Sequence, residues 1–421
     1  MSGQNRKGAA FVMPRTTREW AAATGVWIAA SSWAAAARRR YGAAWVTTPG
    51  GVWTPEEILQ QTAPRATDTP SPLVRRMPVV AKTLAKDVRR YRVATSYHVS
   101  DVNDWCDVDL QFVWQHHDLF HRAGEELARR QGCPLVSFVH APQVWEAKQW
   151  GVRRPGWGSA LERYGERPQL LASDVVACVS DEVAREMRRI GVAGDRIVVC
   201  PTGVDPEKFG PHVSGLGVRE RFGLGDNFTV GWAGSFRSFH GLDTLIEAFA
   251  QLLTEAPEAR LLLVGAGAAR EDLELLTRRL RVDRSTIFTG AVSHSEVPEL
   301  VAAMDVAVVS APRDAGFHYS PQKLREYMAA GTPVVAAKVP DICRFARDGR
   351  EILLFDPGDG VGLAGQLATL HRDPALRAAI GHAGRTLVVA GATWDAQLDR
   401  LVTSEAFHSA VARSGKRVTS P

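Results

Sequence analysis

Short apolar runs alternate with stretches of helical periodicity along most of the chain. In the first half, the apolar or β-branched runs that predict strands lie at residues 9–13, 43–47, 93–97, 113–115, 135–139, 175–179 and 197–200. Helical patterns between them lie at 26–41, 119–130 and 180–190. Residues 49–72 are rich in Pro and Thr and predict a loop with at most a short helix. Buried strands that alternate with helices are typical of a parallel sheet covered on both faces.

The alternation pauses near residue 205 and then starts again. Predicted strands follow at 228–232, 260–264, 286–289, 306–309 and 333–336, with helices at 241–253, 269–280, 295–304 and 322–330. A length of 421 residues fits two domains. We therefore predict an α/β protein with an N-terminal Rossmann-like domain over 1–205 and a C-terminal one over 206–393.

Charge is distributed unevenly between these halves. Residues 1–205 contain 27 Lys and Arg against 21 Asp and Glu, whereas the rest of the chain contains 24 against 25. The N-terminal half therefore either meets an acidic partner, such as an anionic acceptor or a membrane surface, or simply has a solvated basic surface. We find no interleaving of aromatic and basic residues of the kind that binds nucleic acid.

An uncharged segment and the cysteine pattern bear on where in the cell the protein is located. Residues 20–37 form an uncharged run that is long enough for a short membrane span, but half of it is alanine, which contributes little to insertion. Because the run follows a predicted strand, we expect a helix of the first α/β unit instead. The five cysteines are scattered and include no CxxC pair, which favours a reducing, cytoplasmic location.

Candidate ligand-binding residues follow the predicted strands of the C-terminal half. In an open parallel sheet, ligands bind at the carboxyl ends of the strands. Gly234 and Ser235 lie between a strand and a helix, with Arg237 and His240 in the same loop, and Gly265 follows the next strand. Small residues there let the backbone approach a phosphate, although each turn taken alone is more often just a turn.

A third segment, residues 319–335, is more specific. Lys323 and Glu326 are three residues apart on a predicted helix and share one face, so they form either a surface ion pair or a pair of ligand contacts. A cation can meet a diphosphate, and a carboxylate can accept hydrogen bonds from ribose hydroxyls.

Residues 319–335 resemble the donor-site motif of glycosyltransferase family 4, a group of retaining enzymes with the GT-B fold. Residues 172–180, 202–205 with Phe209, 241–249, 288–290 and 305–306 also resemble segments of that family. The resemblance implies two Rossmann-like domains whose parallel sheets face a central cleft, and a tail, residues 394–421, that returns toward the N-terminal domain. It also implies a UDP-, GDP- or dTDP-sugar as co-substrate, with neither a prosthetic group nor a metal ion.

The chain departs from the usual family pattern in a concerted way. His318 stands where the family has the first of two glutamates, and Ser235 and His240 stand at its phosphate-binding Arg and Lys positions. In these departures the chain resembles a subset of the family. It matches that subset also at His140 and Glu146, which follow an N-terminal strand. The resemblance implies His140, Arg237, Lys323 and His318 as catalytic residues. It implies donor contacts at Gly234, Ser235, His240, Gly265, Ser320, Pro321, Leu324 and Glu326, and acceptor-side contacts at Thr24, Gly25 and Glu146.

Two other functions stay open at this point: a nucleotide-sugar epimerase and a non-catalytic donor-binding protein of the same fold. Epimerases need acid and base carboxylates around the sugar, and the sequence shows no clear set. The acceptor also stays open among secondary metabolites, glycans, cell-envelope intermediates and small phosphorylated polyols.

Overall fold

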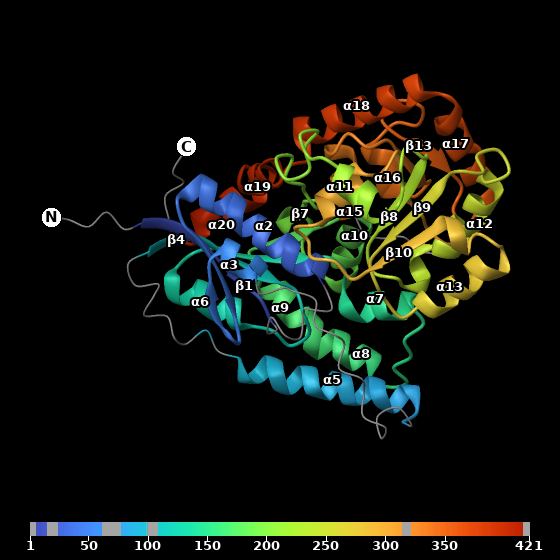
Figure 1. Cartoon of the computed structure of the whole chain (residues 1–421). Coiled ribbons are helices and arrows are strands. Elements are labelled where there is room, and N and C mark those ends of the chain that lie inside the picture. Colours follow the sequence, from blue (N-terminus) through green and yellow to red (C-terminus); the bar gives the residue numbers. More distant parts are fainter. Residues whose placement is uncertain are drawn as a thin grey trace. The chain divides into compact units, whose positions relative to one another are not determined.

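The structure is a computed structural model that describes residues 6–14, 24–60, 77–97, 99, 108–313 and 321–415. The chain forms two compact units (Figure 1). Unit 1 consists of Met1–Thr202 together with Trp394–Pro421, and unit 2 is Gly203–Thr393. Each unit is an α/β domain built on a parallel sheet, as the alternation of apolar and helical segments predicts.

The sheet of unit 1 has seven strands in the order β3-β2-β1-β4-β5-β6-β7. Their bounds are β1 (Arg6–Val12), β2 (Ala44–Thr48), β3 (Gly51–Trp53), β4 (Val108–His116), β5 (Leu135–Val139), β6 (Val175–Cys178) and β7 (Ile197–Val199). All neighbours are parallel except β3, which pairs antiparallel with β2. Phe11, Trp114 and Phe138 from β1, β4 and β5 are fully buried in the core.

The helices of unit 1 come from both ends of the chain. They are α2 (Thr24–Tyr41), α3 (Pro55–Gln60), α5 (Val79–Ser96), α6 (Ala123–Gln131), α7 (Gln143–Gln149), α8 (Gly158–Ala160), the π-helix η2 (Leu161–Glu166), α9 (Arg167–Ala172), α10 (Asp181–Ile190), α19 (Trp394–Val402) and α20 (Glu405–Arg413). Helix α19, the first of the two helices that unit 1 takes from the C-terminal end, packs on α2: the Trp33 and Trp394 rings are 6.0 Å apart, and Arg39 donates two 3.0 Å bonds to Asp395. The last helices therefore complete the core of the first unit.

Unit 2 has a six-stranded, fully parallel sheet in the order β10-β9-β8-β11-β12-β13. Its strands are β8 (Thr229–Ala233), β9 (Arg260–Val264), β10 (Thr286–Gly290), β11 (Val306–Val309), β12 (Val334–Ala337) and β13 (Leu353–Phe355). Its main helices are α11 (Leu216–Arg221), α12 (Leu242–Leu252), α13 (Arg270–Arg279), α14 (Val297–Ala302), α15 (Gln322–Ala329), α16 (Pro340–Phe345), α17 (Gly360–Arg372) and α18 (Pro374–Gly391). Most predicted elements of this unit lie within one or two residues of the observed ones.

Two predictions for the N-terminal half are wrong. Residues 93–97, predicted as a strand, belong mostly to α5, because the apolar residues of that segment follow helical rather than alternating spacing once the whole of 79–96 is considered. Residues 49–72, predicted as a loop with at most a short helix, contain the short helix α3 but also the edge strand β3, and residues 61–72 lie outside the described residues. Within the described residues, no helix has both the length and the apolar character needed to cross a membrane.

Candidate active site

The strand order of unit 2 places its candidate residues at one point of the sheet. The chain runs outward from β8 through β9 to β10, and then from β11 through β12 to β13 on the other side. The switch point of this doubly wound sheet therefore lies between β8 and β11, and ligands bind at the carboxyl ends of strands at such a point. The loop after β8 holds Gly234, Ser235, Arg237 and His240, and the segment after β11 leads into α15 with Lys323.

The loop after β8 lies against the loop after β9 with almost no space between the two backbones. A Cβ atom on Gly265 would lie 1.9 Å from the carbonyl oxygen of Gly234. Both glycines have positive φ, 149° at Gly234 and 133° at Gly265, which side chains rarely allow. Gly234 and Ser235 are exposed, so this tight turn presents bare backbone to solvent, as a phosphate-binding loop does.

This close approach predicts a large effect for Gly265→Ala. The new methyl group would collide with a backbone oxygen and would hold an unfavourable φ, so we expect the free energy of unfolding to fall by about 2–4 kcal/mol. Chemical denaturation measures the change. The matched control is Gly365→Ala within α17, where a Cβ meets nothing within 4 Å and alanine favours the helix, so stability should stay equal or rise. Equal stability of both variants would contradict the prediction.

Lys323, on α15, reaches the same point of the sheet. Its Nζ lies 3.5 Å from the ring centroid of Trp232, near the end of β8, and a Cβ on Gly234 would come within 2.9 Å of it. The contact with the indole ring is a cation–π interaction. Burial lowers the pKa of Lys323 to about 7, and the Glu326 carboxylate acts in the opposite direction. An anion beside the ammonium group would be stabilised strongly in this half-buried setting.

The pKa of His240 indicates that positive charges surround it in the loop after β8. Its ring lies 5.4 Å from Trp232, and its backbone oxygen accepts a 2.5 Å bond from the Ser310 hydroxyl, which follows β11. Burial, together with the positive charges of Lys323 and Arg237, lowers its pKa to about 2. His240 is therefore neutral at neutral pH, in a pocket of positive potential that Lys323 and Arg237 create.

Glu326 is held in place by two neighbours. Its Oε1 accepts a 2.8 Å hydrogen bond from Gln322 Nε2, one turn earlier on α15, and lies 3.3 Å from His294 Nε2. The Glu326 side chain is only 10% exposed, so its carboxylate is largely shielded from water by these groups. The arrangement presents an oriented acceptor one turn from the Lys323 ammonium group.

The remaining predicted donor residues have different placements. Leu324 is fully buried in the core of unit 2, so its side chain packs under the site. Pro321 directly precedes α15, with an extended ψ of 113°. His318 and Ser320 lie outside the described residues.

In unit 1, His140 lies beside a second histidine that the sequence analysis did not single out. His140 follows β5, and His116 ends the neighbouring strand β4, so parallel pairing brings the two rings to 5.3 Å. Burial lowers the pKa of His140 to about 4, and Glu146 acts in the opposite direction. The His140 imidazole is therefore neutral at neutral pH and able to accept a proton at a free ring nitrogen.

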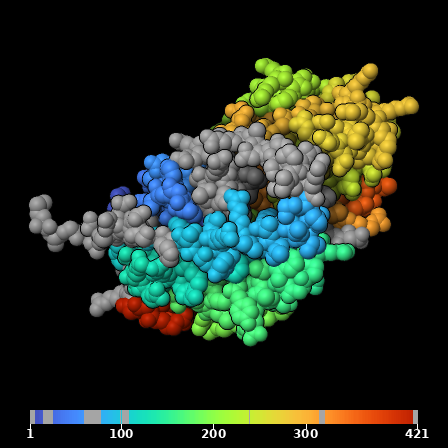
Figure 2. Space-filling model, turned by 90° about the horizontal axis from the view of Figure 1, so that it is seen from below, coloured from blue at the N-terminus to red at the C-terminus, as the bar shows by residue number. Residues whose placement is uncertain are grey.

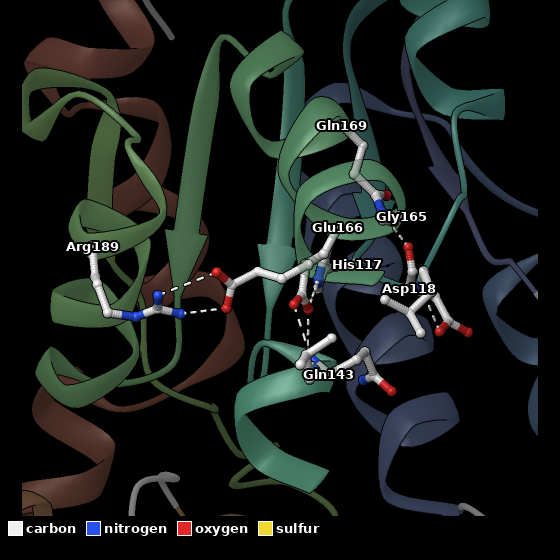
Figure 3. Close-up of polar contacts among 10 residues, drawn as sticks. His117, Asp118, Gln143, Gly165, Glu166, Gln169 and Arg189 are labelled. Atoms are coloured by element: carbon white, nitrogen blue, oxygen red, sulfur yellow. Dashed lines mark hydrogen bonds and ion pairs between the residues drawn. The ribbon is translucent and has the colours of Figure 1, made fainter. Parts of the chain in front are cut away.

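A buried carboxylate fixes the segment that follows His140. Glu166 ends the π-helix η2, and its Oε1 lies 2.9 Å from His117 Nε2 and accepts a hydrogen bond from the Gln143 backbone N–H (Figure 3). Its Oε2 accepts a 3.4 Å bond from the Val144 backbone N–H. A carboxylate at the first turn of a helix satisfies free N–H groups and complements the helix dipole. Glu166 therefore determines where α7 begins and, through it, the position of Glu146.

The other acceptor-side residues are only partly described. Gly25 is exposed in the first turn of α2, and Glu146 is half-buried in the first turn of α7. Helix α2 begins at Thr24, whose side chain lies outside the described residues.

Sequence reasoning missed His116, Trp232, His294 and Glu166. His116, Trp232 and His294 lie at or just after the carboxyl end of a strand, a position that does signal a ligand site. Glu166 carries no such signal, since its partner His117 is 49 residues away.

Comparison with known proteins places the chain in a family. The model described as Glycosyltransferase Family 4 matches residues 25–208, and the model described as Glycosyl transferases group 1 matches residues 227–373. The D-inositol 3-phosphate glycosyltransferase 1 of Catenulispora acidiphila is 30% identical over 308 residues, which cover 70% of this chain and 71% of that protein. The GDP-mannose-dependent alpha-(1-6)-phosphatidylinositol monomannoside mannosyltransferase of Mycolicibacterium smegmatis is 29% identical over 280 residues, 65% of this chain and 71% of that protein.

A solved structure agrees on the fold. HepE of Anabaena, determined in complex with UDP and glucose, has a TM-score of 0.63 at 18% identity and covers 94% of this chain and 98% of its own. The two parallel-sheet units are thus those of a GT-B glycosyltransferase. This chain belongs to glycosyltransferase family 4.

Proposed function

We propose that this protein is a retaining glycosyltransferase that moves a sugar from a nucleotide-diphosphate sugar to an acceptor hydroxyl. The main support for this proposal is the position of the Lys323 ammonium group. It lies on the Trp232 ring, next to the bare backbone of Gly234, at the switch point of unit 2. Cations and bare N–H groups together suit a diphosphate, and the family supplies the reaction type.

Each donor-side residue has a role that follows from its chemistry. Lys323 and Arg237 would neutralise the charge that develops on the departing nucleoside diphosphate, and no step then requires a metal ion to do so. Glu326 would accept hydrogen bonds from the ribose hydroxyls. Arg237 is exposed at the start of the short 3-10 turn 238–240 and raises the local positive potential, as the lowered pKa of His240 indicates.

The acceptor side is assigned to unit 1. We infer that the nucleotide diphosphate leaves while the acceptor hydroxyl attacks on the same face of the sugar, which gives retention. His140, with a neutral imidazole, would contact the transferring sugar or the acceptor, and Gly25 and Glu146 would border the acceptor. We propose an anionic acceptor, because unit 1 is basic and the relatives are named for inositol phosphate and phosphatidylinositol acceptors. The same charge favours peripheral contact with a membrane, and the scattered cysteines favour a cytoplasmic location.

A thermal-shift screen with UDP, GDP, dTDP and ADP tests the donor assignment. Binding to the native state raises its stability by about 2.7 kcal/mol at a hundredfold excess over Kd, so one nucleotide should raise Tm selectively. The matching sugar nucleotide is then incubated with inositol phosphates, and NMR reports the anomeric configuration of the product, which we expect to match the donor. No shift with any nucleotide would overturn the donor site. Conversion of the sugar nucleotide without an acceptor would instead support an epimerase.

A further inference from the structure

The Glu166 side chain is fully buried in unit 1 with three hydrogen-bond partners around its carboxyl group. Two of them, the backbone N–H groups of Gln143 and Val144, can only donate, so this environment fits an ionised carboxylate. His117 then donates through its Nε2–H, which lies 2.9 Å from Oε1, and this assigns the tautomer of its ring. A buried charge is costly unless it is fully hydrogen-bonded, and these three bonds supply that compensation.

The same bonds enclose the backbone segment that carries His140. Before His140, the carbonyl oxygen of Phe138 accepts a 2.9 Å bond from the His117 backbone N–H. After His140, the Gln143 backbone N–H donates to Glu166, which itself binds the His117 side chain (Figure 3). The segment is thus tied at both ends to His117, with His140 between the two ties.

Helix α7, which follows this segment, has no N-terminal cap of its own. Its N-cap residue is Pro142, which has no side-chain acceptor, so the first N–H groups of the helix need a partner from elsewhere. Glu166 supplies that acceptor from a distant part of the chain. The proline ring also fixes φ of Pro142, at −60°, which stiffens the short link between His140 and the helix. The carboxylate therefore acts on His140 through a short and stiff piece of backbone.

A π-helix determines where Glu166 points. Glu166 is the last residue of η2, in which the Arg167 backbone N–H donates to the carbonyl oxygen of Glu162, five residues earlier. Such wide turns are rare and occur frequently at functional sites. The same turn brings the Gly165 carbonyl oxygen within 2.6 Å of the Phe120 backbone N–H, in the loop after β4. One turn of helix thus fixes both the loop after β4 and the loop after β5.

The loop after β4 is held in a strained conformation by the same helix. Phe120 has a φ of 65°, a left-handed value that residues other than glycine adopt rarely. Its ring lies so close to Gly165 that a Cβ atom there would come within 2.7 Å of it. Gln169, in α9, donates hydrogen bonds to the carbonyl oxygens of Asp118 and Gly165. Strain of this kind persists only where the surrounding structure enforces it, and it is concentrated at active sites.

We propose that Glu166 is a positioning residue of the sugar transfer, whose carboxylate holds His140 and the first turn of α7 in the geometry that the reaction needs. The proposal rests on the proposed function, because it assigns Glu166 an effect on the rate at which the sugar is transferred. Glu166 is buried beneath the two loops, so it acts through His117 and Gln143 and touches no substrate. Donor binding is assigned to residues of unit 2, so loss of Glu166 should lower kcat and leave nucleotide affinity unchanged.

Glu166→Gln tests the proposal with a side chain of the same shape. Glutamine has one oxygen, and its NH2 group would face a hydrogen-bond donor, so one attraction becomes a repulsion. We expect kcat to fall about 10- to 100-fold, the larger figure being the loss that a misplacement of about 1 Å can cause. The KM for the sugar donor and the Kd for its nucleotide should each change by less than about twofold. Initial rates with varied donor and calorimetric titration of the nucleotide measure these constants.

The matched control is Glu162→Gln on the same π-helix. Glu162 accepts bonds of 2.5 and 3.2 Å from Arg189, and both side chains are partly exposed. Figure 2 shows the stretch around residue 160, in green, at the surface of unit 1 beside the light-blue α5. The substitution removes a carboxylate of η2 but no bond to the loops after β4 and β5, so kcat should stay within about twofold of wild type.

A second variant covers the case in which Glu166→Gln does not fold. Gln143→Pro removes an N–H group that binds Glu166 but keeps Glu166 and His117. Proline is favoured at the first position of a helix, and Pro142 before it has the extended ψ, 125°, that a following proline requires. Thermal denaturation followed by circular dichroism shows which variants are folded. A folded variant of either kind with the kcat of wild type would overturn the proposal, as would an equal loss of nucleotide affinity, which would indicate general damage to the fold.

Nuclear magnetic resonance separates this proposal from the proposed function. In a long-range proton–nitrogen spectrum of the histidine rings, His117, assigned with His117→Gln, should show the Nε2–H tautomer in the wild type. The ring signals of His140, assigned with His140→Phe, should shift in Glu166→Gln and stay in place in Glu162→Gln. If they do so while the wild type transfers no sugar, the transferase assignment fails and the positioning of His140 by Glu166 stands. Unchanged His140 signals in Glu166→Gln would overturn the positioning role whatever the activity.

Discussion

Replacing Lys323 by alanine will lower kcat/KM for the sugar donor by about 100- to 1,000-fold, the loss typical of removing one group that stabilises developing negative charge in a water-poor site. The Nζ of Lys323 is fixed on the Trp232 ring, 3.5 Å from its centroid, beside the exposed backbone of Gly234. Alanine removes the cation and leaves Trp232 and the fold in place. Steady-state kinetics with varied donor measures the loss.

The matched control for this variant is Lys338→Ala. Lys338 is an exposed lysine of the same unit whose 3.3 Å ion pair with Asp356 is solvated, so its removal should change kcat/KM less than twofold. A folded Lys323→Ala enzyme with undiminished kcat/KM would exclude Lys323 from the reaction.

The pKa of Lys323 adds a pH dependence to the same prediction. Because burial lowers this pKa to about 7, Lys323 is protonated below that pH and loses its charge above it in the free enzyme. Affinity for the nucleoside diphosphate should therefore fall as pH rises above 7. Lys323→Arg should bind with a flat profile, since arginine stays charged. His240 does not contribute in this range, because its pKa is about 2.

The second large effect is expected at Glu326. Glu326→Ala should leave the fold intact and weaken donor binding by about 1.5–3 kcal/mol, roughly 10- to 150-fold, the size of a hydrogen bond to a charged group. The loss should appear in the Kd for the nucleotide and equally for the nucleotide sugar, because the proposed contact is with ribose. Isothermal titration calorimetry measures both constants.

A surface glutamate serves as the control for Glu326→Ala. Glu271 lies in the first turn of α13 and is exposed, so Glu271→Ala should bind the donor normally. His294 and Gln322 remain in the Glu326→Ala protein and could re-pair with each other, which makes a folded variant the expected outcome. Unchanged affinity in that folded protein would remove Glu326 from the donor site.

Local sequence predicted five of the six strands of unit 2 and the helices α12 to α15, but not β13, α11 or α16. Strands such as β9 and β11 are short runs of buried apolar residues, and the helices between them have clear amphipathic spacing. The donor motif was equally visible, because its chemistry is contained in one helix and its entry: Lys323 and Glu326 share a face by their spacing alone. Such features depend on residues that are close in sequence, so the spacing of residue types along the chain is enough to predict them.

Tertiary structure decided the features that depend on strand order. The switch point between β8 and β11 exists only because β11 pairs on the opposite side of β8 from β9, and it brings Lys323 onto Trp232. In unit 1, the pairing of β4 with β5 places His116 against His140. Neither juxtaposition has a signal in the spacing of the residues concerned.

Helix α5 shows the same limit for a single element. Residues 93–97 were predicted as a strand, whereas the helix continues through 93–96. The buried position of Asp87 depends on its ion pair with Arg154, 67 residues further along the chain. Sequence determined that this segment has helical spacing, because that spacing is local. Only the folded chain decided which side of the helix packs inside, because a buried ion pair between distant residues selects it.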